Sequence, residues 1–250
     1  MNAVVIEVKE ECAVWGIVGT LIWGLIIALV FVITQLIVMV IFVALNYGGT
    51  AAADIESIVE NIQYNGTYVS FATFSTLFLC GILIAGVVEL KKNSCIKDYL
   101  GLKRISLKSL GLWMLVAVIF MILSDSLTLV LGKEVVPEFM SRIISSTDSL
   151  WFLWLALIIA APIFEELFFR GFLLSGLSTS FIGPIGAVIV TSVLWAGIHL
   201  QYEIYLLLTI FVLGIILGIA RLKTGSTFLT IGMHSFINLV ASIQAALYLS

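Results

Sequence analysis

Long apolar runs alternate with short polar segments along the whole chain. A helix that spans a membrane needs about 20 mostly apolar residues, and seven segments meet that requirement. They are residues 14–45, 68–90, 109–132, 150–178, 183–202, 203–220 and 227–249. The pattern predicts an all-α polytopic membrane protein. Residues 1–250 would form a single transmembrane domain, a bundle of about seven transmembrane helices, or eight if one span is divided.

The composition narrows the class further. Of the 250 residues, 62% are hydrophobic and 11% are charged, whereas soluble domains carry about 25% charged residues. This excludes a soluble globular protein, a disordered chain and a nucleic-acid-binding domain, which needs a basic surface. The three cysteines, Cys12, Cys80 and Cys95, form no CxxC pair, so neither a disulfide framework nor a thiolate zinc site is indicated. The expected partners are membrane lipids and no nucleic acid.

The basic residues predict how the chain crosses the membrane. The first apolar run has 32 residues without a charge, which is too long for a signal peptide, whose apolar core has about 7–15 residues. With a cytoplasmic N-terminus and seven crossings, two basic residues, Lys133 and Arg142, lie on outer segments and nine on inner ones. The nine are Lys9, Lys91, Lys92, Lys97, Lys103, Arg104, Lys108, Arg221 and Lys223. By the positive-inside rule we expect a multi-pass protein of the cell membrane with its C-terminus outside.

Ionisable groups inside a membrane are costly and usually functional, and here they gather between residues 165 and 238. Glu166 and Arg170 are four residues apart, so they can pair along one face of a helix. Adjacent residues point about 100° apart, which directs Glu165 toward a different neighbour. A carboxylate without a cationic partner in an apolar segment suits a general base or acid. The alternative is an ion pair where a helix reaches the interface.

The only two histidines of the chain also lie in this region. His234 and Asn238 share a helix face at i and i+4, and both side chains can bind a metal or hydrogen-bond a substrate carbonyl. Taken alone, this pair would be read as a hydrogen bond between packed helices, and His199 as an interfacial histidine. These residues indicate a common functional site only if their side chains lie close together in the folded protein.

The rise of a helix places these groups at overlapping depths. At 1.5 Å per residue, Glu165 lies about 22 Å from the outer end of its span, and His199 about 24 Å from the inner end of an antiparallel helix. His234 and Asn238 lie about 12 to 18 Å from the inner end of the last span. The four side chains can therefore meet if the fourth helix continues past the glutamates to about residue 178.

Three motifs in this order resemble a known family. They are Glu165-Glu166-x-x-x-Arg170-Gly171, Trp195-x-x-x-His199 and His234-x-x-x-Asn238. They look like the motifs of the CAAX protease and bacteriocin-processing (CPBP, or Abi) intramembrane proteases, which include the type II CAAX prenyl endopeptidases. The resemblance covers residues 150–245, the region of the catalytic core motifs. Trp195 stands where the family usually has Phe, a change that reads as conservative, and residues 98–102 resemble a cytoplasmic stretch of relatives.

The resemblance implies a fold and a chemistry. The fold would be a helical bundle with an intramembrane polar cavity that opens toward the cytosol, and the reaction would be hydrolysis of a peptide bond. Glu165 would activate the water, His199 would position that water or the carbonyl, and His234 and Asn238 would hold the developing oxyanion. The other two motif residues would mainly orient the helix. The implied site residues are Glu165, Glu166, Arg170, His199, His234 and Asn238.

The cofactor and the substrate are open at this point. Glu165, His199, His234 and Asn238 are candidate ligands for zinc, which needs three protein ligands and one water position. A glutamate base with neutral histidine and asparagine donors can also act without metal, and we favour that interpretation. The substrate would be a membrane-associated peptide or lipidated protein, for example of the prenylated CAAX type.

Two other classes of function compete with the endopeptidase. One is a membrane-peptide binding or bacteriocin self-immunity protein that does not cleave. The other is a transporter with a Glu/His proton relay, for which repeats or broken paired helices are expected and are not visible. The short chain without a targeting tail favours a bacterial inner membrane.

Overall fold

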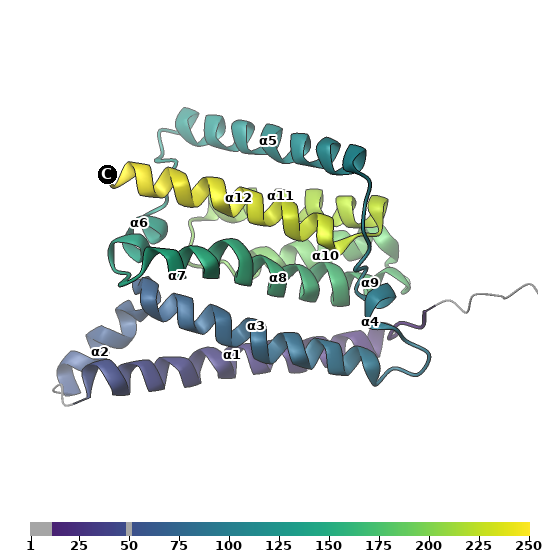
Figure 1. The fold of residues 1–250 in the computed structure, drawn as a ribbon, viewed down its shortest axis with the longest axis horizontal. Coiled ribbons are helices and arrows are strands. Elements are labelled where there is room, and N and C mark those ends of the chain that lie inside the picture. The colour runs from purple at the N-terminus through teal and green to yellow at the C-terminus, as the bar shows by residue number, and fades with distance from the viewer. Residues whose placement is uncertain (1–11, 49–51) are drawn as a thin grey trace, which may run out of the picture.

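The computed structural model describes residues 12–48 and 52–250 (Figure 1). These residues form helices joined by short connections and contain no strand. Lys9, which belongs to the predicted inner segments, lies outside the described residues. The prediction of an all-α polytopic membrane protein is confirmed.

Six helices are long and apolar enough to cross a membrane. They are α1 (Ile17–Tyr47), α3 (Gly66–Glu89), α5 (Leu107–Val130), the composite helix Leu150–Ser178, α11 (Ile204–Thr224) and α12 (Thr227–Tyr248). Their outer faces expose leucine, isoleucine and valine side chains, as lipid-facing surfaces do. This confirms six of the seven predicted spans.

The seventh predicted span, 183–202, is shorter than expected. Only α10 (Gly183–Gly197) is helical there, and 15 residues extend about 22 Å, less than the roughly 30 Å of a hydrocarbon core. The helix ends at Gly197, and the ring Nδ1 of His199 lies 2.8 Å from the carbonyl oxygen of Trp195 in its last turn. Residues 198–203 form a turn that leads into α11, so α10 and α11 form the predicted hairpin.

The composite helix continues past Glu165 and Glu166 to Ser178. This is the condition under which the predicted site residues can lie at the same depth. It consists of α7 (Leu150–Leu155), a π-helical turn (Ala156–Ala160), α8 (Ala161–Glu166), a second π-helical turn (Leu167–Leu173) and α9 (Leu174–Ser178). Pro162 explains the first π turn, because proline has no N–H to donate to the carbonyl one turn earlier. The wider turn accommodates the proline without breaking the helix.

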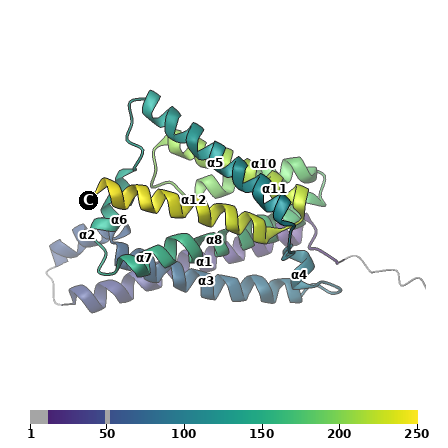
Figure 2. The same cartoon turned by 45° about the horizontal axis from the view of Figure 1, so that its top comes forward.

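Short elements cover the two ends of the bundle. The helices α2 (Ala52–Asn61), η1 (Ile62–Tyr64) and α6 (Glu138–Ser145) lie at the end where the chain finishes, and α4 (Ile96–Tyr99) lies at the other. Figure 2 shows that α5 crosses the bundle obliquely, so that its C-terminal half stands away from α12. The first described residues and the C-terminus are at opposite ends (Figure 1).

Charge separates the two ends. Among residues 12–48 and 52–250, the end that carries α4, here the basic end, holds eight basic residues and two acidic ones, Glu89 and Asp98. The end that carries α2 and α6, here the acidic end, holds eight acidic residues and two basic ones, Lys133 and Arg142. The eight basic residues are Lys91, Lys92, Lys97, Lys103, Arg104, Lys108, Arg221 and Lys223; the eight acidic ones are Asp54, Glu56, Glu60, Asp125, Glu134, Glu138, Asp148 and Glu203.

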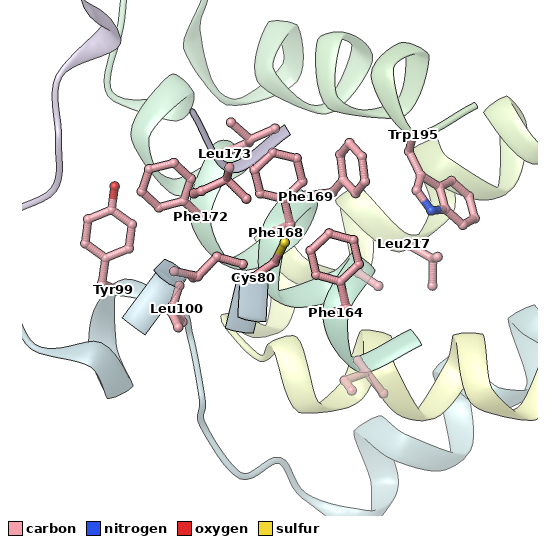
Figure 3. Packing of buried hydrophobic residues seen from close by; sticks show 14 of the residues in the cluster. Cys80, Tyr99, Leu100, Phe164, Phe168, Phe169, Phe172, Leu173, Trp195 and Leu217 are labelled. Atoms are coloured by element: carbon pink, nitrogen blue, oxygen red, sulfur yellow. The ribbon is translucent and has the colours of Figure 1, made fainter. Parts of the chain in front are cut away.

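An aromatic core fills the bundle between these ends. The composite helix contributes a run of phenylalanines, of which Phe164 stacks on Phe168 and Phe172 stacks on Tyr99. Figure 3 shows these rings in a continuous cluster that extends from Tyr99 to Trp195. The core therefore holds the glutamate-bearing helix in place against α3, α10 and α11.

Candidate active site

A cavity of about 360 Å³ lies between α5, α8, α10, α11 and α12. This volume is within the range of about 300–1,000 Å³ typical of ligand sites. Its wall includes four of the six predicted site residues: Glu165, His199, His234 and Asn238. The structure thus collects into one hollow side chains that are up to 73 positions apart in the sequence.

Glu165 occupies the centre of this group. Its Oε2 atom lies 4.0 Å from Nε2 of His199 and 4.0 Å from Nε2 of His234. The three side chains retain 12%, 17% and 5% of their exposure, so they face the cavity without being open to bulk solvent. A gap of 4.0 Å is too wide for a direct hydrogen bond, but one water with contacts of about 2.8 Å can bridge it.

The other ring nitrogen of each histidine is already engaged. His199 Nδ1 faces the carbonyl oxygen of Trp195 at 2.8 Å, and His234 Nδ1 faces Oε1 of Glu166 at 3.1 Å. Both partners accept hydrogen bonds, so Nδ1 of each ring carries the proton. Nε2 of each ring is consequently the atom presented to Glu165 and to anything held in the cavity.

Glu166 and Arg170 form the ion pair that their spacing predicts. Arg170 donates from Nη1 to Oε1 of Glu166 over 2.8 Å, and both side chains are fully buried. The guanidinium also donates to the Gly214 carbonyl at 3.4 Å and lies 4.4 Å above the Trp195 ring. Glu166 does more than orient its helix, because the same Oε1 atom accepts the hydrogen bond from His234.

Trp195 is a site residue that the sequence interpretation underestimated. Its indole Nε1 donates a hydrogen bond to Oε2 of Glu165 at 2.5 Å, and its ring packs edge-on against His199 and His234. The phenylalanine that the family usually has at this position could not donate that bond. The substitution of Phe by Trp therefore adds a hydrogen-bond donor to the site and is not conservative. In the sequence, the only sign of this was that tryptophan has an N–H group and phenylalanine does not.

Asn238 lies in the cavity wall, but its side-chain amide forms a hydrogen bond with a backbone carbonyl. Nδ2 donates to the carbonyl oxygen of Leu157 at 2.8 Å, inside the first π turn of the composite helix. A π turn displaces carbonyls from their usual partners, and Asn238 satisfies one of them. Within the described chain it makes no hydrogen bond to the other five predicted site residues.

Tyr202 adds a polar group that no motif indicated. It lines the cavity, and its ring stacks on His199 with the centroids 6.3 Å apart. Burial raises the pKa of the Tyr202 hydroxyl above its usual range, and the nearby Glu165 carboxylate raises this pKa further. The phenol therefore stays protonated and available as a hydrogen-bond donor near the site.

The cavity reaches the acidic end of the bundle. Its wall includes Val135 and Pro137 from the segment before α6, Phe139 from α6 itself, and Gln201 and Tyr202 from the turn after α10. With a cytoplasmic N-terminus, this end faces away from the cytosol.

The possible zinc ligands only partly resemble a metal site. In residues 12–48 and 52–250 no three His, Cys, Asp or Glu side chains are grouped closely enough to hold a metal ion. Glu165, His199 and His234 come nearest, and the Nδ1–Glu166 contact of His234 resembles the second-shell contacts of metal-bound histidines. The indole of Trp195, however, already occupies the Oε2 atom that both Nε2 atoms face.

Comparison with known proteins agrees with the motif analysis. No curated protein and no solved structure gives a significant match to the chain. Residues 147–240 match the family model described as type II CAAX prenyl endopeptidase Rce1-like. The matched region holds all three motifs and supports a protease in general. Residues 147–240 of the chain are thus similar to the type II CAAX prenyl endopeptidase Rce1-like family.

Proposed function

We propose that this protein is an intramembrane endopeptidase in which Glu165 activates a water molecule. The observation that carries the proposal is the position of Glu165, whose Oε2 faces Nε2 of both histidines at 4.0 Å within a cavity of an apolar bundle. Such spacing suits a bound water or a substrate carbonyl. The substrate is a membrane-associated peptide, which can be lipidated.

The proposed reaction proceeds in two steps. Glu165 takes a proton from the water while the water oxygen attacks the carbonyl carbon, and His199 accepts the second water hydrogen bond at Nε2. The carbonyl oxygen becomes an oxyanion, which His234 and the Tyr202 hydroxyl stabilise. Glu165 then returns its proton to the amide nitrogen as the C–N bond breaks, releasing a carboxylic acid and an amine.

Charge balance supports His234 as the donor to the oxyanion. Uncompensated charges are costly in a bundle of this kind. Arg170 offsets only one of the two carboxylates, Glu165 and Glu166, so a second cationic donor fits beside them. In the proposal His234 is that donor: its Nδ1–H bonds Glu166, and a proton on Nε2 is donated to the oxyanion. Glu166 and Arg170 hold this histidine in place, so they are positioning residues.

The proposed mechanism does not require metal. It assigns a proton-transfer role to Glu165 and hydrogen-bonding roles to the histidines, each of which the observed contacts allow. If zinc binds, Glu165, His199 and His234 would hold it, and it would supply a polarised water in their midst. The effect of a zinc chelator on the cleavage rate distinguishes the metal-free mechanism from the metal-dependent one.

The proposed location is the cell membrane, with the basic end at the cytoplasm and the C-terminus outside. The support is the ratio of eight basic residues at one end to two at the other. A bacterial inner membrane is the preferred setting.

A cleavage assay in detergent tests the function. Wild type is compared with Glu165→Gln and His234→Ala on a farnesylated CAAX peptide and a panel of small membrane peptides. Asp125→Asn is the matched control, because Asp125 is a second carboxylate of the same cavity wall and bonds Gln244 instead of the histidines. Cleavage by wild type and Asp125→Asn, but not by the other two folded variants, is expected. Full biological activity of Glu165→Gln without any cleavage by wild type would indicate a binding or immunity protein.

A further inference from the structure

A second hollow lies at the basic end of the bundle, between the segment around α4 and the start of α12. Its volume is about 690 Å³, and its lining residues are Lys97, Asp98, Leu102, Lys103, Arg104 and Phe228. None of these residues lines the cavity that holds Glu165. The hollow is therefore a feature separate from the candidate active site.

The charges of this hollow favour an anionic ligand. Three of its lining side chains are basic and one is acidic. The acidic one, Asp98, lies with Oδ1 3.5 Å from Nζ of Lys103, and these two side chains are 39% and 52% exposed. An ion pair so open to solvent contributes little, so Asp98 offsets one charge without immobilising Lys103. Lys97 and Arg104 are also exposed and can turn toward a shared ligand.

Apolar side chains complete the hollow and place it at the membrane surface. Leu102 is half-buried, and Phe228, the second residue of α12, keeps 51% of its exposure. Leu107, the first residue of α5, is 84% exposed. Because α5 and α12 are both long enough to cross a membrane, their first turns lie near the level of the lipid headgroups. The hollow thus combines basic groups with an apolar surface at that level.

The segment that carries the basic side chains also holds the start of α12. Thr227 donates from Oγ1 to the Leu100 carbonyl oxygen at 2.5 Å and from its backbone N to the Gly101 carbonyl oxygen at 2.8 Å. Ser226, whose side chain caps α12, donates from Oγ to the carbonyl oxygen of Lys103. A ligand that fixes this segment therefore also stabilises its junction with α12.

We propose that this hollow binds the headgroup of a net-anionic phospholipid and that the bound lipid stabilises the start of α12. Lysine and arginine form charge-assisted hydrogen bonds with phosphate oxygens, and clusters of these residues next to a spanning helix attract anionic lipids. The acyl chains then cover Phe228, which a free anion would leave exposed. The inference does not depend on the proposed endopeptidase activity, because neither the ligand nor the measurements below involve cleavage.

Titration with short-chain lipids tests the ligand. Dioctanoyl phosphatidylglycerol is added to the purified full-length chain in neutral detergent, with dioctanoyl phosphatidylcholine and inorganic phosphate in separate arms. Binding is followed by thermophoresis and by the thermal unfolding midpoint. We expect saturable binding of phosphatidylglycerol with a rise in the midpoint, and little response to the other two probes at the same concentration.

Either of two results in these arms overturns the lipid assignment. A response to inorganic phosphate equal to that of phosphatidylglycerol would indicate a site for a free anion. An equal response to phosphatidylcholine, which has no net charge, would indicate that the acyl chains bind without help from the basic side chains.

A triple variant tests the place of binding. Lys97→Gln/Lys103→Gln/Arg104→Gln removes all three positive charges of the hollow. We expect it to bind phosphatidylglycerol roughly 10- to 100-fold more weakly than wild type and to lose the lipid-dependent rise in the midpoint. If this variant does not accumulate, Lys97→Gln/Arg104→Gln, which keeps the Lys103–Asp98 pair, replaces it and should show a smaller loss of the same kind. Wild-type affinity in the variant that is measured contradicts the proposal.

The matched control removes the same number of charges from the same end of the bundle. Lys92→Gln/Lys108→Gln/Lys223→Gln changes three exposed lysines, none of which lines the hollow. It should keep most of the wild-type affinity and the rise in the midpoint. Equal weakening in the two triple variants would show a diffuse attraction to the basic end instead of a site, and would also overturn the inference.

Discussion

The indole nitrogen of Trp195 donates a hydrogen bond to the Oε2 atom of Glu165, the same oxygen that faces both histidines. The contact joins α10 to α8, and the guanidinium of Arg170 lies over the face of the same indole ring at 4.4 Å. One side chain thereby links the proposed base to the buried ion pair. The orientation of Glu165 therefore depends on a residue outside the glutamate motif.

We expect Trp195→Phe to reduce kcat. Phenylalanine keeps the aromatic packing but removes a hydrogen bond to a charged group, which is worth about 1.5–3 kcal/mol. If that energy orients Glu165 in the transition state, the loss is roughly 10- to 100-fold in kcat, with little change in KM. Steady-state kinetics on a cleaved peptide measures both constants.

Trp154→Phe is the matched control for this change. Trp154 lies in the composite helix, and its indole nitrogen is buried without a hydrogen-bond partner among the described residues. This variant should retain the wild-type kcat. Equal losses of kcat in the two variants would mean that the size of the Trp195 side chain, and not its hydrogen bond to Glu165, determines activity.

Removing the charge of Glu166 should destabilise the protein. Glu166→Gln leaves the fully buried Arg170 without its partner, and breaking a buried ion pair in this way costs about 3–5 kcal/mol. Thermal unfolding in detergent should show a lower midpoint for this variant. Glu138→Gln is the control, because Glu138 and Arg142 form an i,i+4 pair at 3.6 Å on the surface, where such pairs contribute little. A similar midpoint for both variants would contradict a structural role of the buried pair.

Asn238→Ala separates two roles of that residue. If Asn238 mainly satisfies the Leu157 carbonyl, its loss lowers stability by about 1–3 kcal/mol, since a buried acceptor is left without a partner. Stability and kcat should then fall together, because the π turn positions the helix that carries Glu165. A wild-type unfolding midpoint combined with a large loss of kcat would instead assign Asn238 to the oxyanion, as the family resemblance implies.

Chelation is expected to leave activity unchanged. Cleavage rates are measured after dialysis against a strong zinc chelator, together with the metal content of the same samples by mass spectrometry. Full loss of activity, restored by about one zinc per chain, would replace the general-base mechanism with a metal-dependent one. Glu165, His199 and His234 would then be reinterpreted as ligands.

Alkaline pH should destabilise the protein through Tyr99, which is buried at the basic end. Burial raises the pKa of the Tyr99 hydroxyl to about 12, whereas an unfolded tyrosine has a pKa of about 10. Between these values the unfolded state loses its proton and the folded state keeps it, so stability falls by about 2 kcal/mol as the pH rises from 10 to 12. The unfolding midpoint of Tyr99→Phe, which cannot ionise, should decline less over that interval. Parallel declines would show that other groups cause the effect.

Local geometry explains what could be predicted from the sequence. The pairing of Glu166 with Arg170 depends only on the spacing of four residues along one helix, and the composite helix continues to Ser178 as the motifs require. The apolar runs likewise predicted six of the long helices. These features are determined within a single segment, where helical rise and rotation are known in advance.

Features that depend on packing between segments were missed. Hydropathy could not distinguish α10 from a full span, because residues 198–202 carry no formal charge, although the helix ends at Gly197. The bond from Trp195 to Glu165 depends on the rotation of α10 relative to α8. The cavity depends on how five helices, α5, α8, α10, α11 and α12, pack together, and no single motif contains that information.

The two π turns at residues 156–160 and 167–173 change how insertions and deletions should be interpreted. Each one-residue bulge shifts the phase of all later residues by about 100° relative to an unbroken α-helix. A helical wheel drawn from Leu150 would therefore assign the residues beyond Ala160, both glutamates included, to the wrong faces. Aligned relatives could differ by one residue in this helix and still present both glutamates alike, with the bulge absorbing the length difference. Alignments and designed variants of this segment should be anchored on the carboxylates and not on the start of the span.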